Sequence, residues 1–175
     1  MNHSKTEEKI ILAFCNLLLI KKFKDISIKD IITEAGIART TFYNYYDSKK
    51  EFTEEAVNFI FDEITYILNA DLTFQSEVLL EMLTYLHHNK EITLVFINKI
   101  PNIKEIVREY IKTQILNSNI PNLDTQLTDA YGLPFNYSLN IYIETIESII
   151  FSWINNNFKE TPEQIVKFIN HSVRI

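Results

Sequence analysis

The sequence predicts an all-α protein, and three observations lead to that expectation. Its 175 residues include two glycines and four prolines, which are too few for the many turns of a sandwich or barrel. Hydrophobic residues make up 46% of the chain, so that a full core can be buried. The isoleucines recur at spacings of three and four residues, the period of an amphipathic helix. We therefore expect about nine helices with few connections.

Helix-starting patterns place the elements of the first part of the chain. Ser4 and Glu7 have the spacing of a capping box, and Ser27 and Asp30 repeat it. Gly36 ends the second helix, because a helix end with a left-handed backbone strains glycine least. A short helix and a long one follow, the long one opened by a serine with a glutamate three residues later. The helices expected here cover residues 5–22, 27–35, 39–45 and 48–69.

The second part of the chain is expected to hold five more helices. Breaks near Asn89 and at Pro101 separate the first three. The segment 117–134 contains two prolines and a glycine among polar residues, and we expect a loop there. Thr161 with Pro162 has the pattern of a helix start. The helices expected here cover residues 76–89, 91–99, 102–117, 135–158 and 162–173.

Charge is distributed unevenly along the chain. The whole chain carries a net charge of −6. Residues 1–52 hold nine basic against seven acidic side chains, a net of +2, while residues 53–175 have a net of −8. Such asymmetry indicates a local surface that faces a polyanion. We expect a helix-turn-helix domain over residues 1–52 and a helical regulatory and dimerisation domain over 53–175.

Two short helices joined by a glycine turn form a helix-turn-helix. The second helix of this motif enters the major groove of DNA, and here it begins with Arg39, Thr40 and Thr41. Arginine can bond guanine bidentately, and threonine can bond a base or phosphate and touch a thymine methyl. The alternative is a plain packing corner, but such a corner does not need Arg-Thr-Thr at an exposed helix start.

Side chains next to this helix suit the DNA backbone. Tyr43 and Tyr45 each offer a flat apolar body for a sugar and one hydroxyl for a phosphate. Lys49 stands at the start of the next helix, where free backbone N–H groups and the helix dipole favour an anion. These side chains are expected to fix position, whereas the arginine and threonines read sequence.

The segment IKDIITEAGIARTTFYNYYDSKKEF resembles the helix-turn-helix of the TetR family of bacterial transcription regulators. The family pattern corresponds to Gly36, Thr41-Phe42-Tyr43, Tyr45-Tyr46 and Ser48-Lys49. Three positions depart from it: Ala38 replaces a capping serine, Tyr46 a phenylalanine and Lys50 a glutamate. By this resemblance, the residues expected to touch DNA are Ser27, Lys29, Arg39, Thr40, Thr41, Tyr43, Tyr45 and Lys49.

The C-terminal end resembles one TetR subgroup, with a tryptophan, an Asn-rich turn and a Thr-Pro-Glu helix start. The helix over 135–158 is apolar on more than one side, so that it must be buried on more than one side. A second chain across a two-fold axis can supply one cover; the alternative is a central helix inside a monomer. The expected dimer interface is formed by Ile146, Ile149, Ile150, Trp153, Ile165, Phe168 and Ile169.

The family resemblance also implies a small-molecule pocket in the helical core. Aromatic residues at helical spacing can line such a pocket or simply form core, and the sequence leaves both open. His87 and His88 point apart by ~100° on one helix, so that they form no metal pair, and we expect them on the surface. No cofactor or metal is expected. The candidate pocket residues are Phe59, Tyr66, Tyr85, Phe96, Tyr110, Phe135 and Tyr142.

The sequence therefore predicts a ligand-responsive homodimeric regulator that represses transcription from a palindromic operator until a small-molecule inducer releases it. The alternative is a helical interaction module or coactivator that acts through protein partners. No glycine-rich phosphate loop or catalytic triad context is present, so that no enzyme is expected. Cys15 stands alone and indicates a reducing compartment. Without a secretory leader pattern or an apolar run of ~18 residues, we expect a cytoplasmic protein.

Overall fold

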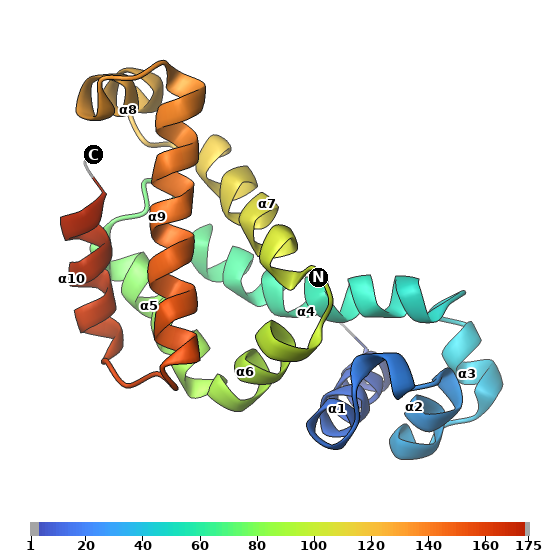
Figure 1. Cartoon of the computed structure of the whole chain (residues 1–175). Coiled ribbons are helices and arrows are strands. Elements are labelled where there is room, and N and C mark those ends of the chain that lie inside the picture. The colour runs from blue at the N-terminus through green and yellow to red at the C-terminus, as the bar shows by residue number, and fades with distance from the viewer. Residues whose placement is uncertain (1–3, 174–175) are drawn as a thin grey trace. The chain divides into compact units, whose positions relative to one another are not determined.

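The structure is a computed structural model that describes residues 4–173. Within that range the chain forms α-helices, one short 3₁₀ helix and no strand, which confirms the all-α expectation (Figure 1). The elements are α1 (Lys5–Ile20), η1 (Phe23–Asp25), α2 (Ile28–Ala35), α3 (Arg39–Tyr43), α4 (Lys49–Leu68), α5 (Ser76–His88), α6 (Lys90–Lys99), α7 (Ile103–Leu116), α8 (Leu123–Tyr131), α9 (Phe135–Asn155) and α10 (Pro162–Ser172).

The chain forms two compact units. Within the described range, the first unit comprises residues 4–63 and 95–101, and the second comprises residues 64–94 and 102–173. Both α4 and α6 run from one unit into the other. The domain boundary expected after residue 52 marks the end of the helix-turn-helix motif and stays a prediction.

The core of the first unit is a cluster of phenylalanine rings. Phe14, Phe42 and Phe52 are fully buried, and the Phe52 ring lies 5.1 Å from Phe14 and 5.5 Å from Phe42, between centroids. Phe96 of α6 adds an edge contact to Phe14. Cys15 is buried beside this cluster, and burial raises the pKa of its thiol to about 12. The thiol therefore stays protonated and packs as a small apolar side chain.

Local sequence signals set the ends of the first helices. Both expected capping boxes form, at Ser4 with Glu7 and at Ser27 with Asp30. Gly36 ends α2 with φ 58° and ψ 44°, in the left-handed region. A Cβ at this position would meet only Lys9 Nζ, at 3.9 Å. The backbone angle, and not a lack of space, is therefore what requires glycine here.

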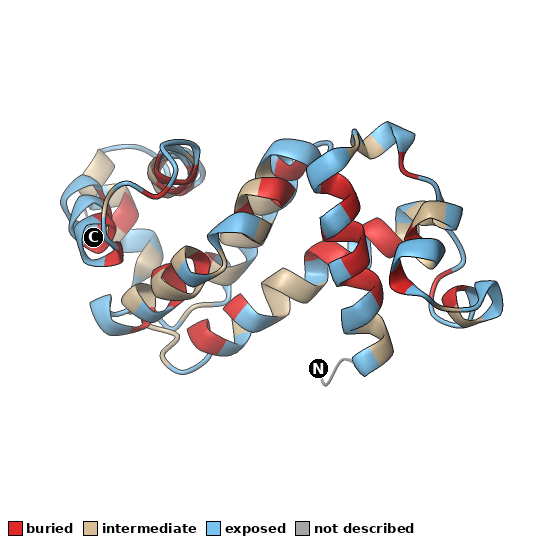
Figure 2. Ribbon diagram, turned by 90° about the horizontal axis from the view of Figure 1, so that it is seen from below, coloured by how far each residue is buried: buried red, intermediate tan, exposed pale blue. Residues whose placement is uncertain are grey.

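In the second unit, α9 packs against α7, α8 and α10, and α10 also packs against α5 (Figure 1). Trp153 of α9 is 2% exposed, and its Nε1 donates a hydrogen bond to the Glu160 carbonyl oxygen at 2.8 Å. The His87 ring stacks on this indole, and the Phe158 ring meets it edge-on. This arrangement fixes the turn between α9 and α10. In Figure 2 buried and exposed residues both occur along the helices, with residues of intermediate exposure between them.

The structure corrects two expectations for this unit. The expected loop over 117–134 contains α8, which ends at Gly132 in the left-handed region. Leu127 holds α8 against the core and is fully buried. His87, expected on the surface, is half-buried because Trp153 provides a flat apolar face for its ring. The other helices begin and end within three residues of their expected limits.

A charged cluster joins α7 to α9. The Glu147 side chain is 4% exposed, and its oxygens lie 3.4 Å from Lys104 Nζ and 3.3 Å from Arg108 Nε. Arg108 also donates a hydrogen bond to Glu144. Glu147 Oε2 accepts no hydrogen bond of regular geometry. The one charged residue buried among residues 4–173 therefore depends on two cations of α7 for its neutralisation.

No helix of the described range is both long enough and apolar enough to cross a lipid bilayer.

Candidate nucleic-acid interface

The turn between α2 and α3 sets the geometry of the candidate site. The Gly36 N–H bonds to the carbonyls of Ile32 and Thr33, and the Ile37 N–H bonds to the Ile32 carbonyl at 3.2 Å. These bonds complete the end of α2 before the chain turns into α3. The α3 helix has five residues, and its N-cap residue, Ala38, makes no side-chain cap bond. The departure from the family pattern at this position thus leaves the start of α3 without a cap.

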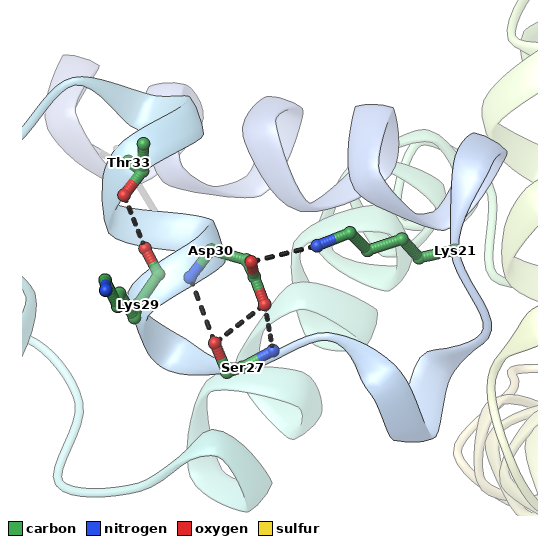
Figure 3. Close-up of polar contacts among 5 residues, drawn as sticks. All are labelled: Lys21, Ser27, Lys29, Asp30 and Thr33. Carbon is green, nitrogen blue, oxygen red and sulfur yellow. Dashed lines mark hydrogen bonds and ion pairs between the residues drawn. The ribbon is translucent and has the colours of Figure 1, made fainter.

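A polar network fixes the start of α2 (Figure 3). The Ser27 hydroxyl donates to Asp30 Oδ2 at 2.7 Å and accepts from the Asp30 N–H at 3.2 Å. Lys21 Nζ donates to Asp30 Oδ1 at 2.9 Å. The Ser27 hydroxyl bond and then the Lys21 ammonium hold the pKa of Asp30 well below its ordinary value. Ser27 therefore has a structural role in addition to its predicted contact with DNA.

This network can be tested through the pH dependence of stability. Because the folded-state pKa of Asp30 lies below the unfolded value of ~3.9, the carboxylate contributes stability above that pH and loses it as pH falls further. We expect Asp30→Asn to flatten the decline in unfolding free energy between about pH 4 and pH 2. Urea unfolding at several pH values measures this slope. The exposed Asp47 supplies the control variant Asp47→Asn, and an equal flattening there would contradict the assignment.

Lys29 lies on the outer side of this helix start. Its side chain is exposed and points away from Lys21 in Figure 3. Its carbonyl accepts a hydrogen bond from the Thr33 hydroxyl at 2.8 Å. Its ammonium makes no ion pair with an acidic side chain among residues 4–173. This cation is therefore available to an external anion.

The predicted sequence-reading side chains lie on the outer face of α3. Arg39 and Thr40 are exposed, and Thr41 is half-buried. On the inner face, Phe42 is fully buried in the ring cluster. Phe42 thus anchors α3 to the core, while Arg39 and Thr40 remain exposed. Tyr43, on the outer face, lies with its ring centroid 5.4 Å from the Arg39 guanidinium carbon.

A surface hollow of about 490 Å³ lies between the start of α2 and α3. Four of the eight predicted contact residues line it: Ser27, Lys29, Arg39 and Tyr43. Ile28 and Ile32 complete its wall. These two isoleucines of α2 are not among the residues that the sequence predicts to touch DNA. Their half-buried state shows that the apolar stripe of this helix continues to the surface.

Lys49 has a partner that the sequence did not indicate. Its Nζ donates to the Phe23 carbonyl oxygen at 2.6 Å and lies 4.2 Å from the centroid of the Phe23 ring. Burial lowers the pKa of this ammonium. Lys49 therefore joins the start of α4 to η1. An ammonium has three N–H donors, and the other two can still serve the predicted phosphate contact.

The remaining tyrosines of the motif divide between surface and core. Tyr45 is partly exposed, and its hydroxyl accepts a hydrogen bond from Ser4 Oγ at 3.2 Å. Tyr46 is 4% exposed and packs its ring against Phe42 and Phe52. It therefore fills the position of the family phenylalanine. Its presence there changes no group on the outer face.

The predicted dimer residues differ widely in exposure. Within its own chain, α9 buries Ile150 and Trp153, and α10 buries Ile165 and Ile169. Ile146 and Ile149 are half-buried, and Phe168 is 48% exposed. Of the seven predicted residues, these last three can offer surface to a second chain. The interface itself stays a prediction.

The predicted pocket residues fall into both units. Phe59 and Phe96 belong to the first unit, where Phe96 is part of the ring cluster. The second unit holds the other five. Among these, Tyr142 is buried, which raises the pKa of its phenol to about 12, and Tyr66 is 76% exposed. The other three are half-buried: Tyr85, Tyr110, whose hydroxyl bonds that of Thr65 at 2.8 Å, and Phe135.

Among the described residues, no three or more His, Cys, Asp or Glu side chains form a group that could hold a metal ion.

Comparison with known proteins identifies relatives of the chain. The family model TetR_C_8, described as "Transcriptional regulator C-terminal region", matches residues 75–174. The HTH-type dhaKLM operon transcriptional activator DhaS of Lactococcus lactis subsp. lactis (strain IL1403) is 34% identical over 89 residues. That match covers 49% of this chain and 45% of the relative, which is less than half of the relative's length.

Three solved structures share the fold. The dihydroxyacetone kinase operon activator DhaS matches with a TM-score of 0.65 and 20% identity over 97% of this chain and 96% of that one. A TetR transcriptional regulator from Streptococcus agalactiae 2603V matches with a TM-score of 0.71 and 20% identity, covering 97% and 94%. A TerR/AcrR family regulator from Aquifex aeolicus VF5 gives 0.62 and 17%, covering 95% and 96%.

These findings agree with the resemblance seen in the sequence. The structural matches show the fold, and the family model covers more than half of the chain. Regulators of this family bind DNA and usually dimerise. The chain therefore belongs to the TetR family of transcription regulators.

Proposed function

We propose that this regulator binds a palindromic operator as a homodimer, with the outer face of α3 in the major groove and the start of α2 on the phosphate backbone. The observation that carries the proposal is the grouping of Ser27, Lys29, Arg39 and Tyr43 around one exposed hollow. The grouping supports the proposal because the Arg39 guanidinium could read a base edge, while the Lys29 ammonium makes no ion pair with an acidic side chain within residues 4–173. Two such sites in a dimer would span half-sites ~34–36 Å apart or a multiple of that.

Removal of each of the two cations of the hollow is expected to change DNA binding in a different way. A duplex selected from a random-sequence library by the wild-type chain serves as the operator. Arg39→Ala is expected to lose about 1–3 kcal/mol of discrimination against the wrong base. Lys29→Ala is expected to weaken binding to all duplexes and to flatten the slope of log K against log salt by ~0.9 per subunit. Binding titrations at several salt concentrations measure both effects.

Lys50→Ala is the matched control, because Lys50 is an exposed lysine outside the hollow. Its ammonium lies 3.8 Å from Glu54. If all three variants bind the selected duplex like the wild type, the interface is assigned wrongly. If no duplex is selected and a protein complex is recovered from cells instead, the alternative of an interaction module is favoured.

The dimer is proposed to form through the exposed faces of α9 and α10. Phe168→Asp introduces a charge at a partly exposed aromatic position of the proposed interface. If Phe168 is a central contact, a loss of about 2 kcal/mol is expected, which weakens association about thirtyfold. Sedimentation velocity across a concentration series measures this change. Tyr66→Asp is the control, since Tyr66 is an exposed aromatic residue outside the proposed interface; equal weakening by both variants would contradict the assignment.

The proposal also includes repression that a small-molecule inducer relieves. The inducer would bind in a pocket of the second unit. Activation is the second candidate, because the sequence relative DhaS is named as a transcriptional activator. A reporter gene joined to the selected duplex distinguishes the two. Deletion of this chain raises reporter expression if it represses and lowers it if it activates. Candidate metabolites are added to the complex of the protein with the duplex, and an inducer is expected to release the duplex.

A further inference from the structure

We infer that Tyr43 is a positioning residue for Arg39, in which the phenol ring holds the guanidinium in place before a base is met. The inference rests on the proposed function, in which Arg39 reads a base edge. It assigns the ring of Tyr43 a task separate from the phosphate contact expected of its hydroxyl.

The geometry places the two side chains one turn apart on the same face. Arg39 is the first residue of α3, and Tyr43 is the last. Residues at this spacing are neighbours on a helix surface. The Arg39 guanidinium carbon lies 5.4 Å from the ring centroid, within the range at which a cation is attracted to an aromatic face.

The Tyr43 ring is itself held in place by the neighbouring Phe42 ring. The Tyr43 ring meets the Phe42 ring at 5.7 Å between centroids and 81° between planes. Phe42 is fully buried and also packs against Phe52. The ring is therefore connected to the core of the first unit, and the guanidinium to the ring.

The start of α3 supplies little restraint of its own. The helix is five residues long, and Ala38 provides no side-chain cap. A long arginine side chain at this position has many rotamers to lose when it binds. Bidentate reading of guanine requires a fixed planar fork. A ring that restricts this fork in the free protein reduces the loss on binding.

Two variants of Tyr43 separate the role of its ring from that of its hydroxyl. Tyr43→Phe keeps the ring and removes the hydroxyl, whereas Tyr43→Leu removes both. Arg39→Ala removes the guanidinium and completes a double-mutant cycle. The probe is the duplex selected by the wild-type chain, together with copies substituted at the base pair where Arg39→Ala loses discrimination. Far-UV circular dichroism establishes that each variant is folded.

Tyr43→Leu is expected to lower discrimination at that base pair about two- to fivefold, the strength of an exposed cation–aromatic contact. Tyr43→Phe is expected to keep the discrimination and to weaken binding to all duplexes equally. In the Arg39→Ala background, Tyr43→Leu is expected to leave discrimination unchanged. If Tyr43→Leu weakens all duplexes equally while discrimination stays at the wild-type level, the ring is a simple contact and the inference is overturned.

A second measurement needs no DNA. In the free wild-type protein, the ring current of Tyr43 is expected to shift the side-chain proton resonances of Arg39, and Tyr43→Leu is expected to remove the shift. Absence of the shift in the wild type overturns the inference. If the shift is present but no duplex is selected, the proposed DNA-binding function fails instead, so that the two failures are distinguished.

Discussion

Phe42→Ala is expected to destabilise the first unit by about 3–5 kcal/mol, the usual loss when a large core side chain is truncated. Phe42 has no exposed surface, and its ring contacts those of Tyr43, Tyr46 and Phe52. Its removal leaves a cavity directly beneath α3. Because α3 has only five residues, it is expected to lose its orientation even where the rest of the unit remains folded.

Urea unfolding monitored by circular dichroism measures the loss of stability, and duplex binding below the unfolding midpoint measures the loss of orientation. Phe42→Leu keeps an apolar side chain in the core and is expected to lose less stability. The surface control is Lys50→Ala, at an exposed position outside the ring cluster, for which a stability change within about 0.5 kcal/mol is expected. Equal stability of Phe42→Ala and the wild type would show that the ring cluster does not hold α3.

Trp153→Ala is expected to have a comparable effect on the second unit, about 3–5 kcal/mol. The indole is 2% exposed, stacks with His87 and meets Phe158 edge-on. The variant also loses the hydrogen bond from Nε1 to the Glu160 carbonyl. The turn that connects α9 to α10 is therefore expected to loosen along with the core.

Trp153→Phe separates the two contributions, since it keeps an aromatic ring and removes the N–H donor. Loss of one such hydrogen bond is expected to destabilise by about 0.5–1.5 kcal/mol. Trp153 is the only tryptophan of the chain, so the unfolding of both variants is followed by circular dichroism and not by fluorescence. If Trp153→Phe is as unstable as Trp153→Ala, the hydrogen bond and not the packing holds this turn.

The parts of the fold that the sequence predicted well are those that depend on neighbours along the chain. A capping box needs only two residues three apart, and both of the first unit form as expected. The left-handed stop at Gly36 is also a local property of one residue. Because the helix-turn-helix is built from such short-range signals, its two helices could be placed to within two residues.

The parts that the sequence did not predict depend on neighbours in space. The α8 helix has a short apolar stripe among polar residues, and what stabilises it is the burial of Leu127 by the rest of the unit. The apolar period of α9 and α10 shows which residues need cover but not what supplies it. Trp153, Ile165 and Ile169 are among the residues expected to meet a second chain, and their own chain buries them; the interface itself stays a prediction.

The candidate site shows the same division. The charged and hydroxyl groups of the motif could be named from the sequence, because each is exposed or half-exposed on a short helix or at a helix start. The bond from Lys49 to the Phe23 carbonyl joins residues 26 apart and leaves no mark in the local pattern. The same holds for the isoleucine wall of the hollow, since an apolar residue on a stripe does not reveal where the stripe reaches the surface.

The cluster around Glu147 restricts how this protein can diverge. The Lys104 side chain is 72% exposed and that of Arg108 is 41% exposed, so that burial alone would not restrict substitution at either position. Losing either one, however, leaves a buried carboxylate short of positive charge, whereas losing the carboxylate leaves cations that water can solvate. The order of substitution is therefore directional: a descendant loses the two cations of α7 more easily after Glu147 has been replaced, and the three positions are expected to change as a group over evolutionary time.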